Sequence, residues 1–223
     1  MAKDIFRNAA PVYFPIEFRS LGLIAGIGSN VAGTKLPAGV VPLDSAQATA
    51  PALLKDKAIA RLWQNVVKHN KAVSDTGQLQ LDATNYTLAV KTPRLESLTL
   101  KRGSLKADFI RIKDADSFQT VAAIAIDGKV LRESKSILII HLTNISNSQA
   151  VFKGYQKLVM EKPGKTPLLV YRGTANLKLN SGTKYKVTAL SANGGKLGPV
   201  IGKSSDGTFS FKLDPGCYPD GVM

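Results

Sequence analysis

From about Thr76 to its end, the chain is a series of short apolar and polar alternations separated by turn residues, and this pattern restricts the fold most. Alternation at a period of two is typical of a β-strand with one face in the core and the other in solvent. The clearest such segments are residues 86–90, 107–112, 121–126, 137–142, 185–190 and 208–213.

Turn signals lie between these segments at residues 127–128, 180–182, 193–195 and 206–207, and all of them are rich in Gly, Asn or Asp. Such pairs between apolar alternations are typical of β-hairpins. Their spacing favours an antiparallel arrangement over βαβ units. The pattern therefore predicts a mainly β protein, an antiparallel β-sandwich of immunoglobulin-like or jelly-roll-like type.

The first third of the chain has a different pattern. Residues 51–70 predict an amphipathic α-helix, because Leu54, Ala58, Leu62 and Val66 recur on one stripe and Pro51 suits a first helical turn. We therefore divide the chain into an N-terminal segment, residues 1–73, with a loop and this helix, and a β-sandwich module, residues 74–223.

The formal net charge of +14 is the strongest deviation in composition. Residues 1–75 contain 9 basic and 5 acidic residues, a net charge of +4, and residues 76–223 contain 21 and 11, a net charge of +10. A positive charge spread in this way attracts polyanions such as nucleic acid, acidic lipid or acidic polysaccharide, without selecting one of them.

The single cysteine, Cys217, excludes an intramolecular disulfide and a zinc site made mainly of thiolates. No run of 18 apolar residues is present, so we expect no membrane-spanning helix. The first residues lack the features of a signal peptide. A turn signal close to the last residue, of the kind that precedes a further strand, favours a piece of a longer secreted or periplasmic protein over a cytoplasmic one.

Several phrases occur in an order that resembles a known module. They are SDTGQL (residues 74–79), YTLAVKTPR (86–94), IDGKVLRESKSILII (126–140), PLLVYRGT (167–174) and YKVTALSANG (185–194). Residues 74–213 thereby resemble the C-terminal β-sandwich that follows the TIM barrel in a group of bacterial, clan A-like glycoside hydrolases. The resemblance implies that the catalytic carboxylates belong to a barrel, and that residues 1–73 are either the last βα segment of that barrel or the connection that docks the sandwich on it. No catalytic residue is carried over to this chain.

The residues themselves give no separate support for catalysis. Glycoside hydrolysis needs two carboxyl groups about 5–10 Å apart, and the acidic residues here lie mostly beside turns or basic neighbours. Asp114 and Asp116 occupy a polar loop without the pattern of a calcium site. His69 and His141 are far apart in sequence, and His141 is interpreted as a structural or surface residue of a strand. We predict no catalytic residue, no metal and no cofactor.

A sugar-binding edge is the remaining site hypothesis. Residues 144–154, rich in Asn, Ser and Lys, predict an irregular loop, and aromatic rings beside amide groups are a usual way to bind sugars. The candidate ligand-binding residues are Asn144, Asn147, Phe152, Tyr155 and Tyr171. The alternative for the same loop is a mobile segment or a surface that docks on the barrel.

These observations lead to one main hypothesis and two alternatives. The chain is expected to be a non-catalytic module of a glycoside hydrolase that binds polysaccharide, acidic chains included, or braces the catalytic TIM barrel. The first alternative is a basic β-domain for nucleic acid or another polyanion, which ranks behind polysaccharide because no known nucleic-acid motif is present. The second is an autonomous hydrolase, which requires two carboxylates in one cleft.

Overall fold

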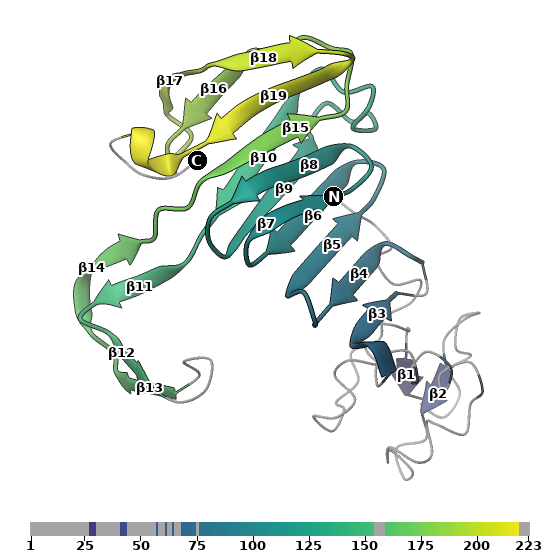
Figure 1. Ribbon diagram of the computed structural model, residues 1–223, viewed down its shortest axis with the longest axis vertical. Coiled ribbons are helices and arrows are strands. Elements are labelled where there is room, and N and C mark those ends of the chain that lie inside the picture. Colours follow the sequence, from purple (N-terminus) through teal and green to yellow (C-terminus); the bar gives the residue numbers. More distant parts are fainter. Residues whose placement is uncertain are drawn as a thin grey trace. The chain divides into compact units, whose positions relative to one another are not determined.

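The computed structural model describes residues 27–29, 41–43, 57, 61, 64, 68–74, 76–153 and 159–218. Within them the chain is mainly β, and its architecture is an antiparallel β-sandwich with one six-stranded and one five-stranded sheet (Figure 1). The alternation in the sequence is thereby confirmed as the signal of the fold class. By internal contacts the chain divides into two compact units, residues 1–99 with 123–138 and residues 100–122 with 139–223.

The six-stranded sheet follows the chain order closely. Its strands, in spatial order, are β10 (Ile137–Leu142), β9 (Gln119–Ala125), β6 (Leu95–Leu100), β5 (Thr87–Lys91), β4 (Leu79–Asp82) and β3 (Lys71–Val73). In β6 and β9 every second residue is buried, which is the burial expected for strands with one face in a core. β3 is the edge strand of this sheet, and it ends at residue 73, where we predicted the boundary between the N-terminal segment and the sandwich module. That domain boundary stays a prediction.

The five-stranded sheet is built from the second unit. Its spatial order is β18 (Gly202–Ser205), β19 (Thr208–Leu213), β15 (Ala175–Leu179), β8 (Ile110–Ala115) and β7 (Gly103–Lys106), with antiparallel pairing throughout. One face of it forms a core that includes Phe109, Ile110, Ile112, Leu177 and Leu213. Phe209 and Phe211 are buried there too.

Four shorter pairs complete the described strands. β1 (Ile27–Ser29) and β2 (Val41–Leu43) are parallel, whereas the other three pairs are antiparallel. These are β11 (Ile145–Ser148) with β14 (Lys165–Val170), β12 (Val151–Lys153) with β13 (Val159–Lys162), and β16 (Val187–Leu190) with β17 (Lys196–Val200). A short 3-10 helix, η4 (Pro215–Cys217), follows β19.

The turn signals have different outcomes. Asp206 and Gly207, with φ angles of 47° and 69°, connect β18 to β19 in the left-handed conformation that two-residue hairpins require. Residues 191–195 likewise connect the paired strands β16 and β17. The hairpin predicted at residues 180–182 is wrong, because β15 pairs with β8 and β19 and the chain passes on to another sheet.

The predicted helix at residues 51–70 lies mostly outside the described residues. Positions 57, 61, 64, 68, 69 and 70 are described; the first five are helical, and Asn70 forms a bend with a φ angle of 51°. Among the described residues, no helix combines the length and the apolar character needed to cross a membrane.

Candidate functional site

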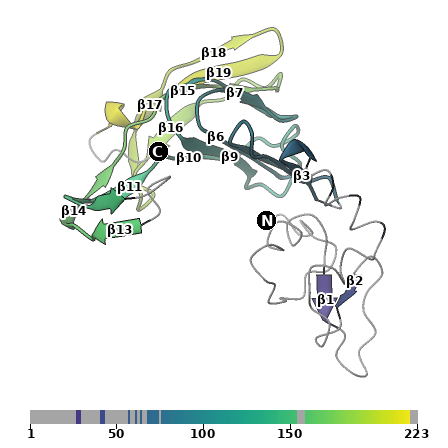
Figure 2. The same cartoon turned by 60° about the horizontal axis from the view of Figure 1, so that its bottom comes forward.

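The most distinctive surface of the second unit is a narrow two-stranded ribbon inserted between β10 and β15. We call it the arm; it consists of β11, β12, β13 and β14. Ile145 pairs with Val170 at the base of the arm, where the ribbon leaves the rest of the unit, and Phe152 pairs with Met160 farther out. Both views show the arm extending away from the five-stranded sheet of its own unit (Figures 1 and 2).

The arm exposes an unusual amount of apolar side chain. Every residue of β13 and β14 is exposed, and the exposed fraction reaches 64% at Leu168 and 61% at Val159. Of the 17 exposed large hydrophobic residues in the described part of the chain, nine lie on the arm and the residue after it: Ile145, Val151, Phe152, Val159, Met160, Leu168, Leu169, Val170 and Tyr171. Large exposed apolar patches mark interaction sites in soluble proteins.

Both faces of the arm are apolar. Leu168, Leu169 and Val170 are consecutive in β14, and consecutive side chains of a strand point to opposite faces. An isolated two-stranded hairpin is marginally stable in water. A ribbon of this kind therefore gains stability from any partner that covers it.

The sequence-predicted site residues lie on or beside the arm, except for Tyr155, which is outside the described residues. The amide of Asn147 donates to the backbone oxygen of Pro163 at 2.8 Å, and the Oδ1 atom of Asn144 accepts from the backbone N–H of Ile145 at 2.9 Å. Tyr171 lies at the base, where its hydroxyl is 3.4 Å from that of Ser146. The two amides thus bind the arm's own backbone. Their role toward a ligand stays a prediction.

The irregular loop predicted over residues 144–154 is wrong. Residues 145–148 and 151–153 are strands, interrupted at Gln149, whose φ angle is 61°. The segment lacks the alternation of a half-buried strand because β11 and β12 pair with exposed partners. Their backbone hydrogen bonds need no buried side-chain face.

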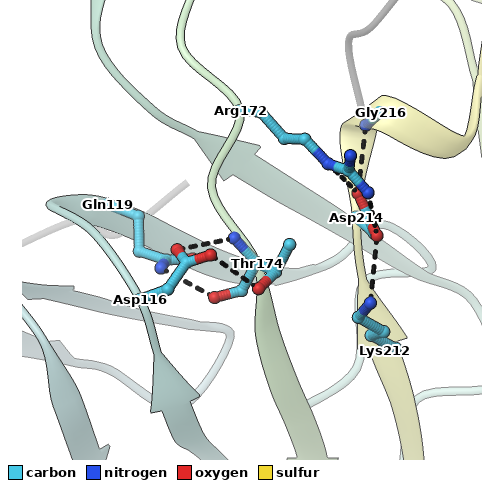
Figure 3. Close-up of polar contacts among 7 residues, drawn as sticks. All are labelled: Asp116, Gln119, Arg172, Thr174, Lys212, Asp214 and Gly216. Atoms are coloured by element: carbon cyan, nitrogen blue, oxygen red, sulfur yellow. Dashed lines mark hydrogen bonds and ion pairs between the residues drawn. The ribbon is translucent and has the colours of Figure 1, made fainter.

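A cluster of polar residues fixes the segment where the chain leaves the arm (Figure 3). We call this cluster the root; it consists of Asp116, Gln119, Arg172, Thr174, Lys212, Asp214 and Gly216. Asp116 accepts hydrogen bonds from the backbone N–H and the hydroxyl of Thr174, at 2.8 and 2.7 Å. The amide of Gln119 donates to the backbone oxygens of Ser117 and Thr174, both at 3.2 Å. Gly173 precedes Thr174 in the chain, and a Cβ atom at Gly173 would lie 2.6 Å from the Ser117 hydroxyl oxygen. Little room is left for the segment to move.

Asp214 fixes the same segment from the other side. The guanidinium group of Arg172 contacts both its oxygens at 2.9 Å, and Lys212 adds an ion pair at 3.0 Å (Figure 3). The backbone N–H of Gly216 donates to it as well. The hydrogen bonds from Arg172 hold the pKa of the buried Asp214 carboxyl far below its ordinary value.

The hydrogen bonds of the root also determine which ring nitrogen of His141 carries the proton. Its Nε2 atom is 2.7 Å from the Oε1 atom of Gln119, and because the Gln119 amide nitrogen donates elsewhere, Oε1 is the acceptor and Nε2 carries the proton. Its Nδ1 atom is buried without a partner. Burial lowers the pKa of His141, against the attraction of Asp116 and Asp214, so the ring is neutral at pH 7. The interpretation of His141 as a structural residue agrees with this geometry.

The carboxylates at the root are arranged for structure. Burial pushes the pKa of Asp116 upward, but hydrogen bonds from Thr174 and Ser117 bring it below its ordinary value. A general acid for glycoside hydrolysis needs a raised pKa instead. Asp114 accepts a hydrogen bond from the amide of Asn176 at 2.9 Å. In the described part of the chain no three His, Cys, Asp or Glu side chains gather as a metal site would require.

Comparison with protein-family models, with curated proteins and with solved structures gives no match for this chain.

Proposed function

We propose that this chain is a non-catalytic β-sandwich module of a carbohydrate-active enzyme, and that its arm braces the module against the catalytic TIM barrel of the parent glycoside hydrolase. The ordered phrases between residues 74 and 213 support the enzyme class. The observation that carries the docking role is the arm: a ribbon apolar on both faces, extending from a root tied down by hydrogen bonds and ion pairs.

The composition of the arm favours a protein partner over a sugar. Its exposed surface is mostly aliphatic, with Leu168, Leu169, Val159 and Met160 among its most exposed members. Aliphatic side chains gain from contact with other apolar side chains, whereas sugar platforms use aromatic rings, of which the described residues of the arm and its base offer Phe152 and Tyr171.

The charges on the arm specify the partner further. The described strands of the arm contain Lys153, Glu161, Lys162 and Lys165, and Lys153 is paired with Glu161 at 2.5 Å. Two positive charges remain beside the apolar strip. The barrel surface that receives the arm is therefore expected to be apolar with an acidic rim.

A mixing experiment tests this proposal. The chain and the separately expressed barrel of its parent enzyme are combined, and the dissociation constant is measured by sedimentation or calorimetry. Covering a largely exposed Leu or Met contributes about 1–2 kcal/mol, so changing Leu168→Asp and Met160→Asp together should weaken binding at least about 30-fold. Ile201→Asp is the matched control, because Ile201 is 87% exposed and lies outside the arm.

Three results would count against the docking of the arm on the barrel. The first is a barrel that does not bind the chain. The second is an equal loss of binding in the control variant. The third is self-association of the chain that both arm substitutions abolish, which would make the arm an interface between copies. Turnover of an aryl glycoside by the chain alone, abolished by one Asp or Glu substitution, would overturn its non-catalytic role.

A further inference from the structure

The outward face of the five-stranded sheet is strongly basic. Its strands β7, β8, β15, β18 and β19 contain six cationic residues and one acidic residue, Asp114. Their other face forms the core, so the alternation of each strand places these cations on the side away from it. We call this surface the basic face; its cations are Lys106, Arg111, Lys113, Lys178, Lys203 and Lys212.

The strand register aligns four of these cations in one row across the sheet. Lys106 lies opposite Arg111, and Arg111 lies opposite Lys178. Ser210 lies opposite both Lys178 and Lys203, which completes the row from β7 to β18. The spatial order of these strands can be followed in Figure 1.

A second, shorter row runs beside the first. In it Asn176 lies between Lys113 and Lys212. Lys212 is paired with Asp214, and Asp114 is bound by the amide of Asn176. In the part of the chain that the structure describes, the four cations of the first row and Lys113 make no ion pair.

This arrangement is costly for the isolated module. Directly opposed residues of antiparallel strands have Cα atoms about 4.5–5.5 Å apart, and like charges in such positions are destabilising. The row contains two such contacts in succession, Lys106 with Arg111 and Arg111 with Lys178. An anionic ligand that lies along the row would relieve this repulsion.

We propose that the basic face binds an acidic polysaccharide whose chain runs across the strands, with its carboxylate or sulfate groups over the row of cations. Neighbouring strands are about 4.8 Å apart, close to the length of one hexose ring in an extended glycan. Successive acidic sugars could therefore meet successive strands. Ser210 and Asn176 offer hydrogen bonds to sugar hydroxyls between the cations.

The same face is less suited to single-stranded nucleic acid. Single strands are held by aromatic side chains that stack on bases, and the five strands place both of their aromatic residues, Phe209 and Phe211, in the core. The inference deepens the proposed function, on which it rests for the choice of a glycan over another polyanion.

The test uses the full chain and four probes: polygalacturonate, dextran sulfate, neutral dextran and mixed-sequence double-stranded DNA. Binding is measured by affinity electrophoresis or interferometry at low and at physiological salt. The test variant combines Arg111→Gln, Lys178→Gln and Lys203→Gln. The control variant combines Lys129→Gln, Lys135→Gln and Lys196→Gln, which removes the same charge from exposed positions outside the row.

We expect the chain to bind polygalacturonate or dextran sulfate, and not neutral dextran, with an affinity that falls as salt rises. A preference between the two acidic probes distinguishes carboxylate from sulfate as the recognised group. The test variant should lose about tenfold or more in affinity, from three ionic contacts, and the control less than about twofold.

Failure to bind both acidic glycans would overturn the inference, as would an equal loss in both variants. Tighter binding of DNA, lost in the same test variant, would assign the face to nucleic acid instead. These failures leave the docking of the arm intact, because that interaction is measured with the barrel and with different substitutions.

Discussion

Replacing Gln119 by leucine is expected to lower the free energy of unfolding by about 3 kcal/mol. The Gln119 side chain is fully buried, and it makes three hydrogen bonds, to the backbone oxygens of Ser117 and Thr174 and to the Nε2 atom of His141. A hydrogen bond between neutral groups contributes about 1 kcal/mol net. Leucine has a similar volume, so the loss of hydrogen bonds dominates over a cavity.

A double-mutant cycle with His141→Leu separates this network from general packing. The single change at Gln119 leaves the buried Nε2–H group of His141 without an acceptor, whereas the double change removes donor and acceptor together. Removing both partners costs less than orphaning one of them. The two substitutions should therefore be non-additive, with a coupling of about 1 kcal/mol or more.

Urea unfolding followed by circular dichroism gives these free energies. Gln80→Leu is the matched control, because Gln80 is an exposed strand glutamine and its loss should change stability by less than about 0.5 kcal/mol. Additive effects at Gln119 and His141, or a loss at Gln119 no larger than that of the control, would refute the reasoning. Faster hydrogen exchange of the β14 amides in Gln119→Leu would link the root to the order of the arm.

Three further predictions follow from single features. Burial keeps the pKa of His141 in the folded chain below 6.5, so the unfolded chain binds the proton first as the pH falls. The free energy of unfolding should therefore fall as the pH drops below that value, which urea unfolding curves from about pH 7.5 to about pH 5 check. The dependence of this free energy on pH should be weaker in His141→Gln. Gly202→Ala should cost about 1–3 kcal/mol, because a Cβ there would overlap the buried ring of Phe209, whereas Gly182→Ala, with open space, should be nearly neutral in the same melts. Lys178→Gln should raise the thermal midpoint at low salt, by relief of roughly 0.2–1 kcal/mol of like-charge repulsion, and the gain should shrink as salt is added.

The fold class could be predicted because its signal is local. A strand with one buried face shows it within about six residues, as β19 does with buried Phe209, Phe211 and Leu213 at every second position. The turn at Asp206 and Gly207 is equally local. The arm gave no such signal, because strands exposed on both faces need no alternation, and its Asn and Ser residues indicated a loop instead.

The basic face could be predicted from the sequence only in part. Arg111 and Lys113 alternate with buried residues in β8, as Lys178 does in β15, so each strand alone indicates a basic outer side. The row appears only when β15 is placed between β8 and β19, and this order depends on pairing between segments more than 60 residues apart, such as Asn176 with Lys113. The composition shows an excess of positive charge but not where in the fold that charge lies.

The root illustrates why the rest of the site could not be predicted. Asp116 and Thr174 are 58 residues apart in the chain, and Arg172 and Asp214 are 42 apart. Each of these residues alone is an ordinary polar residue beside a turn or a strand end, and it acquires its role only when β15 pairs with both β8 and β19. The same pairing that aligns the cations of the basic face brings these carboxylates to the base of the arm. Substitution of Asp116 or Thr174 should affect the arm and leave the binding of polyanions by the basic face largely unchanged, because neither residue contacts the row of Lys106, Arg111, Lys178 and Lys203 through a hydrogen bond or ion pair.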